Sequence, residues 1–134
     1  MLGLVVVVAV LATATLGGLL YRSRSGRLTP ASATELPAGL LDGLDGVTLL
    51  HFSSATCAPC RQVRSVCADL STTMAGVRHV EIDADEHLDA ARELDIWRLP
   101  TLLVVDRRGR IAQRAVGVPD PAALSAAVSE VLAA

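Results

Sequence analysis

The stretch Ser54-Ala55-Thr56-Cys57-Ala58-Pro59-Cys60-Arg61 holds two cysteines, separated by two residues, between segments of different character. The preceding segment, residues 47–53, is short, apolar and rich in strand-forming residues, which predicts a buried parallel strand. After Cys60, apolar residues recur every three or four positions from Val63 to Met74, which predicts a helix with one buried face. The cysteines are therefore expected on a strand-to-helix turn.

This position favours thiol chemistry. The first-turn amide groups of a helix are unpaired and its N-terminus is electropositive, so a thiolate at Cys57 would be stabilised there. The thiolate is the nucleophile in disulfide exchange, and each unit by which its pKa falls corresponds to about 1.4 kcal/mol. Two intervening residues bring Cys60 within bonding reach of Cys57. The pair is therefore predicted to open and close as a redox-active disulfide.

An apolar run occupies the N-terminus of this 134-residue chain. Leu2 to Leu20 contains no charged residue and no proline, and as a helix rising about 1.5 Å per residue it would span roughly 28 Å. We interpret residues 1–21 as an uncleaved transmembrane anchor. The alternative is a cleaved signal peptide, because Ala12-Thr13-Ala14 resembles a cleavage site. The absence of a basic residue before the run, and the leucines after Ala14, favour the anchor.

Basic residues flank one end of this run. Arg22, Arg24 and Arg27 follow it, whereas nothing basic precedes it, so the positive-inside rule predicts a cytoplasmic domain on a single-pass membrane protein. The extracytoplasmic orientation stays open, since the argument depends on three arginines. Residues 22–34, rich in Ser, Gly, Pro, Ala and Thr, are predicted to form a flexible linker. The remaining residues, 35–134, would form one domain.

Further elements follow from periodicity and turn residues. A short helix is expected over residues 35–44, a second strand over 77–83 and a helix over 86–94. Residues 101–105 and 110–116, joined by a turn at Gly109, predict a β-hairpin, and Asp120-Pro121 predicts the start of a closing helix. From residue 47 onward the order is β-α-β-α-β-β-α, an α/β fold with a central mixed sheet.

Composition excludes some classes of function. The net charge is −2 and the aromatic residues are few, so neither a basic nucleic-acid surface nor a base-stacking platform is present. Three cysteines do not make a disulfide framework. One CxxC pair and one additional cysteine fit redox chemistry better, and no organic cofactor is expected because the cysteines themselves would carry the electrons.

Two motifs resemble the thioredoxin family: Cys57-Ala58-Pro59-Cys60-Arg61 and, later in the chain, Leu99-Pro100-Thr101. The resemblance runs from about residue 47 to the C-terminus. It implies a thioredoxin-like fold and a thiol-disulfide oxidoreductase that acts on protein disulfides or dithiols and draws on an upstream thiol electron donor. It also implies that Pro100 is cis and faces the cysteines, and that the backbone beside it binds an extended substrate segment.

The mechanism implied by this resemblance has two steps. Cys57 attacks a partner disulfide to form a mixed disulfide, and Cys60 then attacks Cys57 and frees the partner as a dithiol. The reverse sequence oxidises a dithiol. The residues are set by the motif, whereas the direction of electron flow is not.

The sequence also departs from the family pattern. His51 stands six residues before Cys57, where thioredoxins usually carry a buried aspartate. We consider it as the base for Cys60, as a charged group that stabilises a thiolate, or as an inert strand residue. His79 matches the position of the accompanying lysine and is interpreted as an ordinary strand residue. Thr56 replaces the usual tryptophan; Trp97 either supplies part of that substrate-binding surface or packs under the loop.

Two other functions stay open at this stage. Cys57 and Cys60, with His51 or Cys67, would hold copper or zinc in a metal-binding module, although no further ligand cluster completes a tetrahedral site. A non-catalytic adaptor is the third hypothesis. Cys67 lies two turns after Cys60 on the apolar helix face, which favours a packing role.

Overall fold

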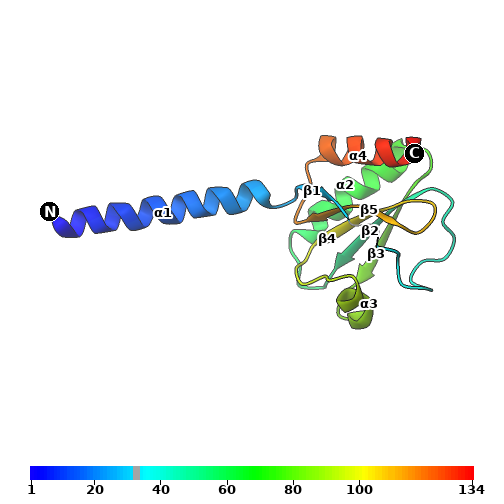
Figure 1. The fold of residues 1–134 in the computed structure, drawn as a ribbon, viewed down its shortest axis with the longest axis horizontal. Helices are drawn as coiled ribbons and strands as arrows, with labels where there is room; N and C mark the ends of the chain where they lie inside the picture. Colours follow the sequence, from blue (N-terminus) through cyan, green and yellow to red (C-terminus); the bar gives the residue numbers. More distant parts are fainter. Residues whose placement is uncertain (32–33) are drawn as a thin grey trace.

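The computed structural model describes residues 1–31 and 34–134. Helices and strands alternate along most of the chain (Figure 1). In chain order they are α1 (Leu2–Arg24), β1 (Leu28–Pro30), β2 (Val47–Ser53), α2 (Cys60–Thr73), β3 (Val77–Asp83), α3 (Leu88–Glu93), β4 (Thr101–Val105), β5 (Ile111–Val116) and α4 (Pro121–Ala133). From β2 onward this is the predicted β-α-β-α-β-β-α order of an α/β fold.

The strands form one mixed sheet in the order β1-β5-β4-β2-β3. Strands β2 and β3 are parallel, as expected for a strand-helix-strand unit whose helix crosses over the sheet. All other neighbours are antiparallel, and β4 and β5 form the predicted hairpin. Strand β2 lies between β4 and β3 and every one of its residues is buried, which explains its nearly continuous apolar sequence.

Helices cover both faces of the sheet (Figure 1). Helices α2 and α4 lie on one face, where Leu49 of β2 packs with Val63 and Leu124. Helix α3 lies on the other, where Phe52 packs with Leu94 and Leu103. Side chains alternate between faces along a strand, so β2 contributes to both hydrophobic clusters.

Helix α1 projects away from the sheet and has no buried residue (Figure 1). It is a candidate membrane span by length and apolar composition, although a signal sequence near the N-terminus meets the same criteria. The helix continues to Arg24, three residues beyond the predicted anchor 1–21. Its last turn carries Arg22 and Arg24, the cations that a helix C-terminus favours.

The predicted helix over residues 35–44 is wrong. This segment is a series of turns with one bridge between Glu35 and Arg110. Gly39 and Gly43 both adopt positive φ, at 80° and 65°, which interrupts helical hydrogen bonding. The leucines of the segment still become partly buried: Leu36, Leu40 and Leu41 pack against the cluster beneath α3. Their spacing resembles a helical period, but turns bring them to the core.

The predicted linker 22–34 contains ordered structure. Leu28–Pro30 adds strand β1 to the sheet, antiparallel to β5, because the edge of β5 offers unpaired backbone groups and Leu28 packs against the core. Residues 32 and 33 of this predicted linker lie outside the described residues. The helix predicted over 86–94 is shorter, at Leu88–Glu93.

Candidate redox site

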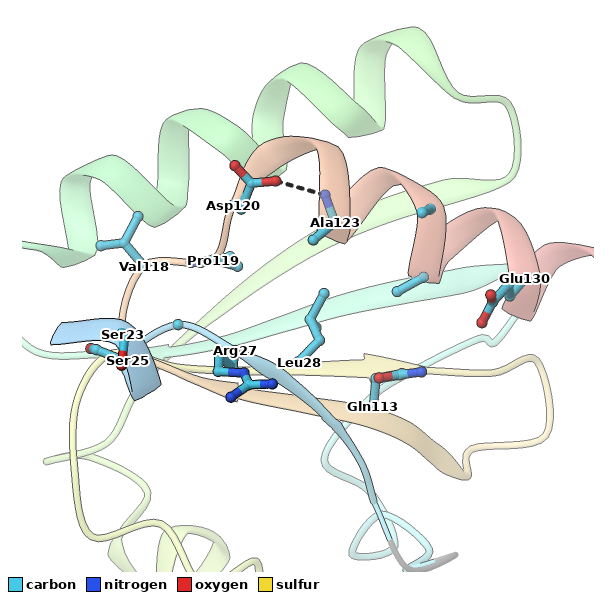
Figure 2. A pocket seen from close by; sticks show the side chains of 13 residues that line it. Ser23, Ser25, Arg27, Leu28, Gln113, Val118, Pro119, Asp120, Ala123 and Glu130 are labelled. Carbon is cyan, nitrogen blue, oxygen red and sulfur yellow. Dashed lines mark hydrogen bonds between the residues drawn. The ribbon is translucent and has the colours of Figure 1, made fainter. Parts of the chain in front are cut away.

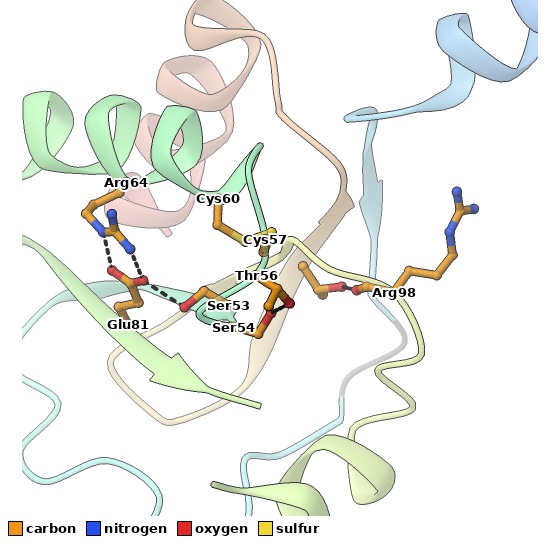
Figure 3. Close-up of a disulfide and its surroundings, with 9 residues drawn as sticks. Ser53, Ser54, Thr56, Cys57, Cys60, Arg64, Glu81 and Arg98 are labelled. Carbon is orange, nitrogen blue, oxygen red and sulfur yellow. Dashed lines mark hydrogen bonds and ion pairs between the residues drawn. A yellow bond between two sulfur atoms is a disulfide. The ribbon is translucent and has the colours of Figure 1, made fainter. Parts of the chain in front are cut away.

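Cys57 and Cys60 lie on the turn between β2 and α2, as predicted, and form a disulfide with 5.4 Å between their Cα atoms (Figure 3). Strand β2 ends at Ser53 and helix α2 begins at Cys60. Cys57 is half-buried, whereas Cys60 is 1% exposed. The more accessible sulfur is therefore the one that a partner thiol or disulfide can reach first.

The Leu99–Pro100 bond is cis, as the resemblance implied, and the loop that contains it lies at the same end of the sheet as the disulfide. Phe52, near the end of β2, pairs with Thr101 at the start of β4. The chain segments immediately beyond these residues are the cysteine turn and Pro100. The register of two antiparallel strands thus brings together motifs that are far apart in the sequence.

The residues predicted to bind substrate have different surroundings. Trp97 is 76% exposed and donates a hydrogen bond from Nε1 to Asp95 Oδ1, so it does not pack under the loop. The Thr101 side chain is buried and donates to the carbonyl of Arg98 at 2.6 Å. Leu99 is half-buried against the α3 cluster. Trp97 is therefore the predicted substrate-binding side chain with the most surface to offer.

His51 is completely buried in the centre of β2. By alternation it shares the α2 face with Leu49, and it pairs across the parallel ladder with Glu81 of β3. Neither ring nitrogen has a hydrogen-bond partner among the described residues. Burial lowers the pKa of His51 to about 4, so the imidazole is neutral at pH 7.

A polar network that the sequence analysis did not identify lies beside His51 and is centred on Glu81, its neighbour in the parallel ladder. Arg64 of α2 binds Glu81 through two nitrogens, at 2.5 and 2.6 Å, and Ser53 donates to the same carboxylate at 2.7 Å (Figure 3). The hydrogen bond from Arg64 is the main reason that the pKa of Glu81 falls to about 2. The sequence did contain a signal for this network. By alternation, Ser53 of β2 and His79 and Glu81 of β3 lie on the face of the sheet that α2 covers.

His79 lies beside His51, with ring centroids 5.8 Å apart. Burial lowers its pKa as well. Together with Glu81 the two histidines form a group whose potential ligand atoms all lie within 4.8 Å of one another. Glu81 is already engaged by Arg64 and Ser53, and this group does not include the cysteines that the metal hypothesis requires.

Cys67 is a core residue. It is fully buried and packs in the cluster between the sheet and helices α2 and α4. Burial raises the pKa of its thiol to about 12, so the reactive thiolate is not formed at neutral pH. The predicted packing role is confirmed.

A family model described as Thioredoxin matches residues 38–130. Among curated proteins, the chain is 33% identical to Thioredoxin of Malassezia sympodialis over 90 residues, which cover 66% of this chain and 84% of that protein. It is 30% identical to Thioredoxin H2 of Arabidopsis thaliana over 69 residues, 52% of this chain. That match spans about half of the Arabidopsis protein, at 51%.

A solved structure supports the same assignment. A mutant thioredoxin from Halobacterium salinarum superposes with a TM-score of 0.61 at 25% identity, over 66% of this chain and 76% of that one. The cysteine pair and these relatives together support thiol-disulfide oxidoreductase activity.

Proposed function

The chain belongs to the thioredoxin family, and from that premise we propose that it is a membrane-tethered oxidoreductase that reduces protein disulfides. The observation that carries the proposal is the pairing of a half-buried Cys57 with a buried Cys60 at the start of α2. One sulfur is accessible to a partner and the other is protected. This asymmetry suits an exchange in which an intermediate is resolved within the protein.

The reaction is a two-electron exchange. In the reduced protein, the Cys57 thiolate attacks a substrate disulfide; one substrate sulfur leaves as a thiolate and a mixed disulfide forms. Cys60 loses its proton and attacks the Cys57 sulfur, which closes the Cys57–Cys60 bond and releases the second substrate thiolate. The substrate gains two electrons and two protons, and a dithiol donor later restores the protein.

We assign His51 as the group that accepts the proton of Cys60, directly or through a water molecule. Its burial on the α2 face supports this role, as does the lack of a hydrogen-bond partner for its nitrogens within the described part of the chain. The lowered pKa keeps the imidazole unprotonated but also makes it a weak base, so its contribution is expected to be small for general base catalysis. The substrate backbone would bind beside Leu99, Pro100 and Thr101, with Trp97 as an adjoining apolar surface.

Trapping tests this proposal directly. The reduced full chain in detergent is mixed with a peptide that contains one intramolecular disulfide, and free thiols are counted by alkylation. Cys57→Ser should bring reduction to the uncatalysed rate, whereas Cys60→Ser should accumulate a mixed disulfide through Cys57. Cys67→Ala is the matched control, because it removes the third thiol without burying a hydroxyl, and it should react like the parent. A parent protein that reduces nothing, while its thiols alkylate normally, would reject the oxidoreductase assignment.

Membrane insertion through α1, with the domain in the cytoplasm, is the localisation that we propose. The exposed apolar helix and the arginines at its C-terminal end support it. Labelling of the cysteine pair in intact cells with a membrane-impermeant maleimide is the test. Protection until the cells are opened supports the cytoplasmic side, whereas immediate labelling supports the opposite one. Recovery of the chain in the soluble fraction, shortened by its first residues, would indicate a cleaved signal sequence.

A further inference from the structure

We call α1 and the three residues that join it to β1 the tether. The point where the tether enters the sheet and the Cys57–Cys60 disulfide lie at the same end of the sheet. Leu28, the first residue of β1, pairs with Ala115 near the end of β5. The next residue of β5, Val116, pairs with Thr101 at the start of β4, which in turn pairs with Phe52 near the end of β2. Beyond this end lie the α1 junction, the Pro100 loop and the cysteine turn. With strands about 4.8 Å apart, β1 and β2 are separated by roughly 14 Å.

The junction between α1 and β1 is held against the domain. The Gly26 amide donates to the Val116 carbonyl at 2.6 Å. A Cβ atom on Gly26, whose φ is +77°, would lie 1.9 Å from the carbonyl oxygen of Val118, so the contact admits only glycine. Figure 2 shows Ser25 and Val118 near this junction, with Leu28 directed from β1 toward α4. Only three residues separate α1 from β1, so the helix cannot move far from the sheet.

A second contact joins the helix to the substrate loop. The Arg98 guanidinium lies 5.0 Å from the centre of the Tyr21 ring, at the end of α1. The Arg98 carbonyl accepts from Thr101, so the same residue belongs to the loop that carries Pro100. In Figure 3 the Arg98 side chain points away from the disulfide and toward the end of α1. The loop beside the reactive pair is therefore in contact with the base of the tether.

We infer that the disulfide faces the bilayer surface and that its substrates are integral membrane proteins whose disulfide lies within the first few residues outside a membrane span. This inference depends on the membrane tethering proposed above. Because the junction is docked, the domain is held with Cys57 a short distance above the lipid. A flexible linker would instead let the domain reach disulfides over a wide range of heights.

The inference is tested by comparing the rates at which disulfides at two distances from the membrane are reduced. The reduced full chain is placed in lipid vesicles with a synthetic single-span peptide that carries a disulfide loop. The loop is placed either three residues from the span or beyond ten prolines, about 30 Å away in the extended proline conformation. Reduction is followed by alkylation and mass spectrometry, and rates are normalised to the cysteines accessible to an impermeant reagent. The near loop should be reduced at least about tenfold faster.

The control variant keeps the contact of Gly26 with Val116 but separates α1 from it, so that α1 no longer holds the domain close to the membrane. Twenty-four Gly and Ser residues inserted between Arg24 and Ser25 have a root-mean-square span of about 27 Å. This variant should reduce both loops at rates within about threefold of each other. Equal rates for near and far loops with the unmodified chain would overturn the inference.

The proposed function has a separate readout. A soluble disulfide peptide added to the same vesicles measures exchange that does not depend on height. If the soluble peptide is reduced while near and far loops react equally, the positional inference is wrong and the oxidoreductase assignment stands. If none of the three peptides is reduced, the oxidoreductase assignment itself is rejected.

Discussion

The two faces of strand β2 differ sharply although they are built from alternate residues of one segment. On the α3 face, Leu50 and Phe52 enter a cluster whose buried members are all apolar. On the α2 face, the strand begins with Val47 and Leu49 but continues, toward the disulfide, with His51 and Ser53. The α3 face of the strand begins with the buried Thr48 and becomes hydrophobic toward the cysteines, whereas the α2 face becomes polar as it approaches them.

The α3 face of β2 contributes mainly to stability, whereas we propose that the α2 face contributes to the chemistry of the cysteine pair. Apolar burial provides most of the free energy of folding, and Leu50 and Phe52 on the α3 face contribute to it. A buried histidine to which residues 1–31 and 34–134 offer no hydrogen bond costs free energy instead. The α2 face carries this cost on the strand that leads into the cysteine turn, where we propose that a proton acceptor is used. Substitutions on the two faces should therefore affect different properties.

Phe52→Ala should have the largest effect, on stability. Removal of a fully buried aromatic ring leaves a cavity, and the expected loss is about 3 to 5 kcal/mol of unfolding free energy. Chemical denaturation of the reduced and oxidised protein measures it. The fraction that stays folded should still exchange disulfides at the parent rate. A similar loss of exchange rate in that folded fraction would show that the α3 face also contributes to chemistry.

Acidification should destabilise the protein through the α2 face. The folded-state pKa of His51, about 4, lies below the ordinary 6.5, so below pH 6.5 the unfolded chain binds a proton that the folded chain does not. Stability should fall as the pH drops from about 6.5 to 4, by at most about 3 kcal/mol. His79 contributes in the same direction, because burial lowers its pKa too, whereas the depressed pKa of Glu81 acts only at lower pH.

The His51→Leu variant isolates this dependence. Denaturation curves at pH 6.5 and pH 4.5 should differ less for His51→Leu than for the parent, while the exposed His87→Leu should behave like the parent. An identical pH dependence in all three proteins would show that His51 does not titrate in this range.

The same His51→Leu variant should slow the second chemical step. Without an acceptor for the Cys60 proton, resolution of the mixed disulfide should fall by about tenfold at pH 7, equivalent to about 1.4 kcal/mol. Stopped-flow release of substrate thiol measures this step, whereas formation of the mixed disulfide should not change. Stability at pH 7 should be equal or higher, because a buried polar group is removed. An unchanged resolution rate would assign His51 to the structure alone.

Arg64→Ala should have the smallest effect. The Arg64–Glu81 pair is accessible to solvent, so its loss should cost less than about 1 kcal/mol. The pKa of Glu81 should rise from about 2 toward its ordinary value, because the hydrogen bond from Arg64 is the main cause of its depression. Carboxyl titration by NMR gives the readout, with the exposed Arg61→Ala as control. A Glu81 pKa that stays depressed would assign the effect to Ser53.

Much of the fold could be predicted because the information is local. The period of two in β3 and of three to four in α2, the turn at Gly109 and the cap at Asp120 each act within a few residues. The cysteine turn was predicted for the same reason, from the two segments beside it. The network of Ser53, Arg64 and Glu81 was not, since it depends on the register between two strands and on which helix residue lies above them.

By itself, the sequence determined the reactive pair, the apolar N-terminal helix and the order of elements from residue 47 onward. Tertiary structure decided the rest. The unpaired edge of β5 recruited part of the predicted linker as strand β1. Positive φ at Gly39 and Gly43 kept the leucines of residues 35–44 out of a helix. The sheet register also placed the tether and the disulfide at one end. The added strand and the shared end of the sheet depend on backbone partners supplied by distant segments, which no local pattern contains.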